Sequence, residues 1–182
     1  MNDLSGTTLE IREVSGRKAL RDFIRVPWSI YKDDPNWVPP LIAERKDALS
    51  PSHPYFKHAQ WCGWIAYQNG KPVGRICAQI DELHQKQYDT RVGFFGLIES
   101  IEDDSVFQAL FSNAEKWLRD HGMQQIVGPF NLGINQEVGL LVEGFDTPPF
   151  IMMGHAPPYY AEAIERCGYY QVQDLLAYEL DD

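Results

Sequence analysis

Residues 128–160 combine an apolar composition with many glycines and prolines, and they carry polar side chains that could do chemistry. They hold two amides, Asn131 and Asn135, the carboxylate of Glu137 and the imidazole of His155. An amide can donate to a carbonyl group, a carboxylate can hold an ammonium, and a histidine with a pKa near about 6.5 can take a proton at neutral pH. This set of residue types could therefore bind a carbonyl and an amine and move a proton between them.

The same residues also have structural interpretations, which the sequence leaves open. Asn131 and Asn135 could satisfy the backbone of turns, and a lone histidine before proline-rich sequence, such as His155, is often a turn residue. Residues 140–142 read as a buried, strand-like piece, and residues 150–153 add four more large apolar side chains. Methionines among them suit either the wall of an apolar pocket or an ordinary core.

Composition limits the class of protein. The 182 residues are 44% hydrophobic and 13% aromatic, which suits one domain with a real core. A net charge of −10 would repel duplex nucleic acid, so we expect no nucleic-acid partner. No apolar run reaches the roughly 18 residues of a transmembrane segment. The first residues do not resemble a signal peptide, so we expect a cytoplasmic location. Three widely spaced cysteines predict neither disulfides nor a metal site.

Hydrophobic periodicity predicts strands and helices in alternation along the first half of the chain. It predicts a strand at residues 9–14, a helix after Ser15 that breaks or restarts at Pro27, and a helix from Pro39 to about Leu49. Two β-rich runs joined by Asn69-Gly70 predict a hairpin with a type I′ turn. Residues 92–100 predict a third, more apolar strand.

The second half continues the alternation. A strongly amphipathic helix is predicted to begin at a capping box formed by Ser105 and Gln108, and to end at Gly122. A strand at residues 124–130, a short helix that starts at Pro157-Pro158, and a closing strand at residues 170–180 complete the chain. The order predicts an α/β domain with a central mixed β-sheet flanked by helices.

That order, with "NGKPVGRI" in the hairpin and "AEAIERCGYY" near the end, resembles the GNAT superfamily, the Gcn5-related N-acetyltransferases. Longer phrases, "YKDDPNWVPPL", "VGFFGLIES", "GPFNLGINQEVGLLVEGFDTPPFIMM" and "PPYYAEAIERCGYY", look like the YghO-like group within it, which includes bacterial ceramide-synthase-like acyltransferases. The resemblance implies a GNAT-like fold over residues 1–182 and transfer of an acyl group from a thioester to an amine. Members of this group are often longer, so the chain is expected to be a single domain or one half of a two-part architecture.

The donor side departs from the GNAT pattern. A typical GNAT holds the pyrophosphate of CoA with a glycine-rich loop at a helix N-terminus, whereas this chain reads "ESIEDDSVFQAL". The resemblance implies acetyl-CoA or a longer acyl-CoA next to Ile98, Ser105 and Val106, but the acidic residues 102–104 would repel phosphate. The alternatives are CoA bound through other amides, a carrier-protein thioester, or no donor at all.

The resemblance also implies roles around the place where two neighbouring strands separate. Glu99, at the end of the first strand, is the expected base. Many GNATs place a tyrosine that acts as the general acid four residues before the position of Gly168. This chain has Ile164 there. Tyr160 lies one turn earlier on the same helix face, with Tyr159 beside it, and is the expected general acid. Each of these side chains could equally be a solvated strand end or a packing residue.

The acceptor side is expected to lie opposite Glu99. There Asn131, Asn135, Glu137 and His155 would form one wall, and the aromatic residues Trp28, Tyr31 and Trp37 another. We expect a small-molecule or lipid-like amine, such as a long-chain amino-alcohol, and no metal. Two other hypotheses remain. One is a non-catalytic GNAT-fold module that binds a ligand or partner, and the other is a half-domain that needs a second GNAT-like half and would show an open sheet edge or form a homodimer.

Overall fold

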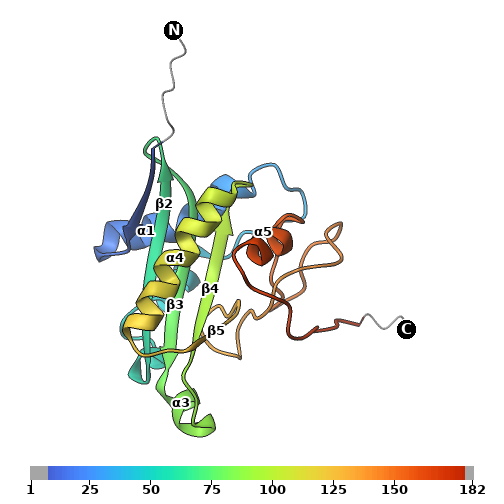
Figure 1. Ribbon diagram of the computed structural model, residues 1–182. Helices are drawn as coiled ribbons and strands as arrows, with labels where there is room; N and C mark the ends of the chain where they lie inside the picture. The colour runs from blue at the N-terminus through green and yellow to red at the C-terminus, as the bar shows by residue number, and fades with distance from the viewer. Residues whose placement is uncertain (1–7, 179–182) are drawn as a thin grey trace.

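A five-stranded sheet in the order β1-β2-β3-β4-β5 forms the centre of the computed structural model, which describes residues 8–178 (Figure 1). The strands are β1 (Leu9–Glu13), β2 (Ala59–Gln68), β3 (Lys71–Asp81), β4 (Val92–Ser100) and β5 (Gln125–Val127). The first four pair antiparallel, and β5 pairs parallel to β4. The predicted mixed α/β sheet is confirmed.

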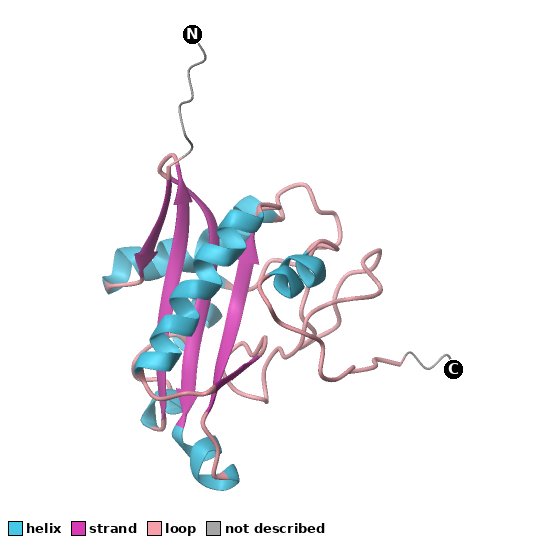
Figure 2. Cartoon of the chain, viewed as in Figure 1, coloured by secondary structure: helices cyan, strands magenta, loops and turns pink. Residues whose placement is uncertain are grey.

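Helices cover both faces of the sheet (Figure 2). They are α1 (Gly16–Ile30), α2 (Ile42–Ala48), α3 (Glu82–Tyr88), α4 (Asp104–Asp120) and α5 (Tyr160–Arg166), with a 3₁₀ turn η1 (Pro54–Lys57). One core cluster lies between the sheet, α4 and α5, and a second lies between the sheet, α1 and η1. Within residues 8–178, no helix has both the length and the apolar character that a bilayer crossing needs.

The hairpin and the long helix are the elements that the sequence predicts best. Asn69 and Gly70 have φ values of 50° and 76°, as the type I′ turn requires. Helix α4 buries its apolar stripe and is followed by Gly122 at φ 82°. Its predicted cap is wrong, however, because Asp103 and not Ser105 is the N-cap: the carboxylate of Asp103 accepts from the Ser105 amide at 2.9 Å.

Pro27 does not break the first helix, contrary to the prediction. Helix α1 runs on to Ile30, with Pro27 buried inside it. A proline cannot donate to the carbonyl four residues earlier, which here belongs to Phe23. The guanidinium of Arg75, on β3, donates to that carbonyl at 3.0 Å and supplies the missing partner. The helix survives because a side chain replaces the lost backbone bond.

Two other helices differ from the prediction. Helix α2 begins at Ile42, after the two prolines, and α3 was not predicted. Asp81 caps α3 through its own carboxylate, which accepts from the Leu83 amide at 2.9 Å. The local signal was therefore present in the sequence as a good N-cap residue.

The predicted closing strand is absent from the described residues. Residues 170–178 form neither helix nor strand and are exposed, and residues 179–180 lie outside the described part of the chain. The nearest sheet edge is β5, which pairs with β4 over only three residues. A strand-like sequence needs a neighbour of matching length to form a ladder, and this short edge does not provide one.

The apolar segments inside residues 140–153 also differ from the expectation. Residues 140–142 are not a strand. Leu140 and Leu141 are half-buried and pack against the α4-side core, as expected, whereas Val142 is 47% exposed. Phe150 and Ile151 are 64% and 93% exposed, and Met152 and Met153 are exposed as well. These four side chains belong to neither core cluster of the described residues.

A β-bulge in β4 decides which way its last residues face. Three residues of β4 after Gly96 lie opposite two of β3, since Cys77 pairs with Gly96 and Arg75 with Glu99, and Leu97 has a φ of 48°. Phe95 packs in the α4-side cluster, whereas Leu97 packs on the α1 side. The extra residue reverses the alternation. Glu99 therefore lies opposite Arg75, on the α1 side of the sheet, rather than in the α4 core.

Candidate active site

Glu99 is the centre of a buried polar cluster at the end of β4. Its side chain is 13% exposed, and Arg75 on the adjacent strand approaches it at 3.5 Å. Burial raises the pKa of Glu99 above its ordinary value, although Arg75 and two tyrosine hydroxyls act in the opposite direction. A carboxylate with a raised pKa accepts a proton more readily than an ordinary glutamate does.

Two tyrosines from distant parts of the chain meet at the same oxygen of Glu99. The hydroxyl of Tyr31, at the end of α1, donates to Oε2 at 2.5 Å, and the hydroxyl of Tyr160, in α5, donates to it at 3.0 Å. Both tyrosines are almost fully buried, and burial first, then the charge of Glu99, raises the pKa of each. Both phenols therefore stay protonated, and their protons point at the carboxylate.

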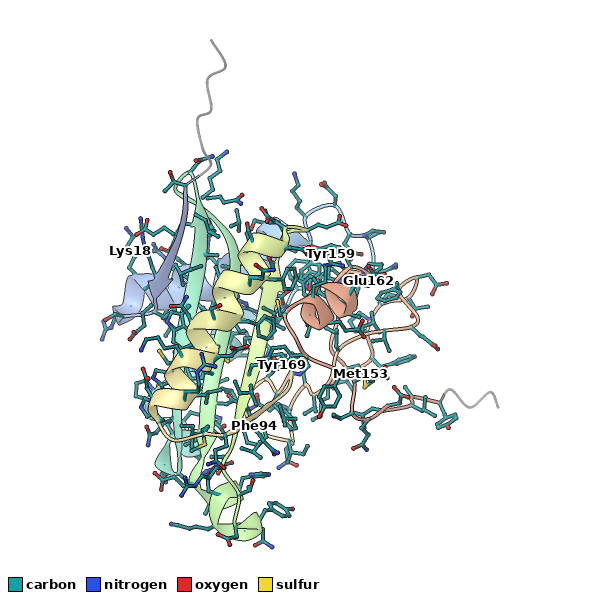
Figure 3. The ribbon with its side chains drawn as sticks, in the orientation of Figure 1. Lys18, Phe94, Met153, Tyr159, Glu162 and Tyr169 are labelled. Carbon is teal, nitrogen blue, oxygen red and sulfur yellow. The ribbon has the colours of Figure 1, made fainter. Side chains whose placement is uncertain are left out.

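Tyr160 also closes the edge of β4. Its hydroxyl accepts from the amide of Ser100 at 2.7 Å, while the neighbouring Tyr159 donates to the carbonyl of Ser100 at 2.8 Å. Burial raises the pKa of Tyr159 to about 12. Figure 3 shows Tyr159 where α5 approaches the end of β4. The two tyrosines thus occupy backbone groups that a neighbouring strand would otherwise use.

The β4–β5 ladder ends at Phe94, and one further backbone bond joins the amide of Phe130 to the carbonyl of Phe95 at 2.8 Å. Beyond that bond, side chains contact β4. The amide of Leu97, at the bulge, donates to Oδ1 of Asn131 at 2.7 Å, and Nδ2 of Asn131 donates to Glu137 at 2.8 Å. Glu137 in turn forms an ion pair with Arg45 of α2. An amide oxygen at the Leu97 N–H stands where the oxygen of a substrate carbonyl could accept the same bond.

Arg45, Arg75, Leu97 and Asn131 are among the residues that line a small pocket between α1, α2 and the bulge. The side chains of Arg45 and Arg75 are 22% and 9% exposed, and each is paired with a carboxylate. Glu99 itself does not line the pocket, which reaches the site through Arg75, the ion-pair partner of Glu99.

His155 lies on the opposite side of Tyr31 and forms a dyad with Asp34. Its Nε2 is 2.7 Å from Oδ2 of Asp34, and its side chain is 7% exposed. Burial alone would raise the pKa of Asp34, but the bond from His155 and two backbone donors outweigh it and lower that pKa. Trp37 stacks on Tyr31, with ring centroids 5.2 Å apart. The Asp34–His155 dyad and the stacked Trp37 thus hold the loop that follows Tyr31 against the Tyr31 side chain.

The donor side differs from a phosphate cradle. The amides of Ser105 and Val106 are taken by Asp103, at 2.9 Å to its carboxylate and 3.0 Å to its carbonyl. Asp103 also accepts from Gln68 at 2.9 Å. The side chains of Val106 and Ile98 are buried in the α4-side core. The N-terminus of α4 is therefore occupied by the protein's own carboxylate.

The structure brings some predicted site residues together and separates others. Glu99 and Tyr160 meet directly, and Asn131 and Glu137 are bonded to each other. His155 reaches the cluster only through Tyr31, and Asn135 is exposed. No group of three or more His, Cys, Asp or Glu side chains gathers as a metal site among residues 8–178.

The sequence reasoning missed four partners: Tyr31 as a donor to Glu99, and Arg75, Arg45 and Asp34. Of these, Arg75 carried a usable signal. A lone arginine in the apolar run "VGRICAQI" is expected to be exposed unless a charge partner lies on the neighbouring strand.

Replacing Tyr160 by phenylalanine removes a hydroxyl that contacts Glu99 and Ser100. The buried amide of Ser100 then loses its partner, so we expect a loss of about 1–3 kcal/mol in the free energy of unfolding. Tyr169→Phe is the matched control, because its hydroxyl bonds to Glu115 on the side of α4, away from Glu99. Urea denaturation measures both, and equal losses would show that Tyr160 has no special role in closing the β4 edge.

Comparisons with known proteins point to one fold. No protein-family model matches the chain. It is 51% identical over 168 residues to the protein YghO of Escherichia coli, and 46% identical over 182 residues to the bacterial ceramide synthase of Caulobacter vibrioides. These matches cover 92% and 99% of this chain but 43% and 47% of the relatives, so the chain spans about half of their length.

Solved structures agree on the fold at low sequence identity. An aminoglycoside N-acetyltransferase AAC(6')-Iy in complex with CoA superimposes with a TM-score of 0.54, at 14% identity and 96% coverage of both chains. A tandem GNAT protein from the clavulanic acid biosynthesis pathway gives 0.57 at 12% identity, over 88% of this chain and 43% of that one. The chain therefore has the GNAT acetyltransferase fold, and in sequence it is closely similar to part of YghO and part of the Caulobacter bacterial ceramide synthase.

Proposed function

We propose that this chain carries the reaction centre of an N-acyltransferase, which moves an acyl group from a thioester to an amine. The observation that carries the proposal is the buried Glu99, held by Tyr31 and Tyr160 at the end of β4. The GNAT fold and the name of the Caulobacter relative support it. In longer proteins of this kind, the chain would supply the catalytic half.

The reaction needs a neutral amine, and Glu99 can provide it. An amine arrives as an ammonium, whose proton passes to the Glu99 carboxylate. The free nitrogen then attacks the thioester carbon, and a C–N bond forms while the carbonyl oxygen becomes negative. The Leu97 N–H would stabilise that oxygen once the side chain of Asn131 moves aside. The adduct loses its second amine proton to water as it collapses.

The leaving thiolate needs a proton, and Tyr160 can deliver it. Collapse of the adduct breaks the C–S bond, and the thiolate takes the phenolic proton of Tyr160. Because the pKa of Tyr160 is raised well above its ordinary value, a free phenolate would be costly. Glu99, 3.0 Å away, can return its proton to Tyr160 in the same step. The cycle then ends with an amide, a free thiol and an ionised Glu99.

We propose an acyl-CoA or an acyl carrier protein as the donor, and a lipid-like amine as the acceptor. AAC(6')-Iy forms a complex with CoA, and the Caulobacter relative is named a ceramide synthase, which supports these two classes. The carboxylate of Asp103 opposes a pyrophosphate at the N-terminus of α4. A donor would therefore be held mainly by contacts other than those amides.

The donor is tested by thermal stability and product analysis. The purified chain is mixed with acyl-CoAs of two to sixteen carbons or with an acylated carrier protein, and then with sphinganine or an aminoglycoside. A donor that binds only the folded chain should raise the melting temperature, and mass spectrometry should find an N-acylated product.

Asp103→Asn keeps an oxygen for the cap and removes the charge, so it should tighten CoA binding if phosphate lies near α4.

One observation favours a second function, a non-catalytic module that binds a ligand or partner. The occupied N-terminus of α4 leaves no free amides at Ser105 and Val106 for phosphate. This function predicts that acyl-CoA or carrier protein gives no product with any amine. Product from any pair, lost in Glu99→Gln, would exclude it.

A further inference from the structure

Large apolar side chains gather on two segments that do not pack against the sheet. The first is residues 150–153, and the second is the tail, residues 170–178, in which five apolar side chains are 60–82% exposed: Tyr170, Val172, Leu175, Leu176 and Tyr178. We call these two segments the apolar face. Monomeric proteins rarely leave so many large apolar residues exposed in one place without a partner.

The two segments adjoin each other in space. A methyl group built on Gly139 would lie 3.6 Å from Cδ1 of Leu175, in the tail. One built on Gly154, next to Met153, would lie 3.4 Å from the carbonyl oxygen of Gly139. Figure 1 shows the loop and the tail together beyond α5, on the side of the molecule away from β1, and Figure 3 labels Met153 of the first segment.

The tail has the sequence of a strand without a strand partner. "YQVQ" alternates apolar and polar residues, and "LLAY" continues with β-compatible side chains. The described residues nevertheless place it in no ladder, and β5, the last strand of the sheet, pairs only with β4. Such a segment can join a sheet that another folded unit provides.

We infer that the apolar face is the docking surface for a second folded domain, the other part of a two-part architecture. The chain matches 43% and 47% of its two curated relatives and 43% of a tandem GNAT protein, so each has room for a domain of similar length. The inference concerns assembly and does not depend on the proposed reaction.

The charges near the face disfavour two other occupants. After Arg119 the sequence contains one basic residue, Arg166, while Glu143, Asp146 and Asp174 lie in or beside the two segments. The segments 143–153 and 170–178 hold no lysine or arginine, so they add no attraction to an anionic bilayer. In a symmetric dimer the face would meet a second copy of itself, so the carboxylates of both copies would share one interface without cations from either segment to pair with them.

The test compares the 182-residue chain with a fusion in which it replaces the matching part of the Caulobacter relative. Hydrogen exchange should show at least tenfold slower exchange for amides 170–178 in the fusion than in the chain alone. Ile151→Asp and Leu176→Asp should lower the melting temperature of the fusion but not of the chain. Leu83→Asp is the matched control, because Leu83 is 55% exposed on α3, at the opposite end of the sheet.

Several outcomes would overturn the inference. They are equal exchange in both proteins, tail amides already protected in a dimer of the chain alone, and binding of the chain to phosphatidylglycerol vesicles through Ile151. If the fusion does not fold, the same exchange measurement on the intact Caulobacter protein, at the positions that align with residues 150–153 and 170–178, decides the question. None of these measurements uses the transferase activity, so failure of the proposed reaction would be seen separately.

Discussion

Replacing Glu99 by glutamine is expected to lower kcat/KM for acyl transfer by about 10²–10⁴-fold, the range that removal of a general base produces. Glutamine keeps an oxygen that can accept from Tyr31 and Tyr160, so the fold should persist. Glu102→Gln is the matched control, because Glu102 is an exposed carboxylate three residues away. Steady-state kinetics with the best donor and acceptor pair gives the comparison, and equal rates in the two variants would remove Glu99 from the mechanism.

The same variant should change the pH dependence. Burial raises the pKa of Glu99 above 4.5, so the activity of the parent should rise as pH increases through that raised pKa, and Glu99→Gln should lack this limb. The contribution of Glu99 to the free energy of unfolding depends on pH in the opposite direction. A carboxyl with a raised pKa in the folded state stabilises the fold fully below its unfolded pKa, and this contribution is lost as pH rises through the folded value. Urea titrations of both proteins between pH 4 and pH 8 would show the difference.

Gly96→Ala is expected to disrupt the site more completely than any side-chain deletion. A Cβ at this position would lie 1.7 Å from the carbonyl oxygen of Phe130 and 2.6 Å from its carbonyl carbon, and both atoms are backbone. Backbone cannot rotate away, so the segment after β5 must leave β4. We expect a loss of more than about 4 kcal/mol in the free energy of unfolding, or no soluble protein.

Gly133→Ala is the matched control for that substitution. Its added methyl group would meet only Cε2 of Tyr55, at 4.0 Å, which is an ordinary contact distance. Urea denaturation and soluble yield should therefore be close to those of the parent. Equal stability of Gly96→Ala and Gly133→Ala would show that residue 130 does not lie as close to β4 as the structure places it.

Local signals explain which elements could be predicted from the sequence. The hairpin was predictable because Asn69-Gly70 determines its own turn, and α4 because its apolar stripe repeats over several turns. The closing strand was not, because strand formation depends on a neighbour, which the short β5 does not provide. The cap of α4 failed for a different reason: Asp103 and Ser105 are both good N-cap residues, and Asp103 also gains a bond from Gln68.

The candidate site was predictable in its residue types but not in its geometry. The family resemblance pointed to Glu99 and Tyr160, and the structure places them in contact. The bulge at Leu97 gives no signal in the apolar run "VGFFGLIES", yet it decides that Glu99 faces Arg75 and Tyr31. Contacts such as that of Tyr31 join residues 68 positions apart, and periodicity carries no information at that range.

Pro27 couples the regularity of α1 to the charge balance around Glu99. Since the proline leaves the carbonyl of Phe23 without its helical partner, that carbonyl is free to hold Arg75 beside the carboxylate. A residue with a backbone N–H at position 27 would regularise the helix, and Arg75 would then share its acceptor. A regular helix and a well-held arginine therefore place opposite requirements on this one position.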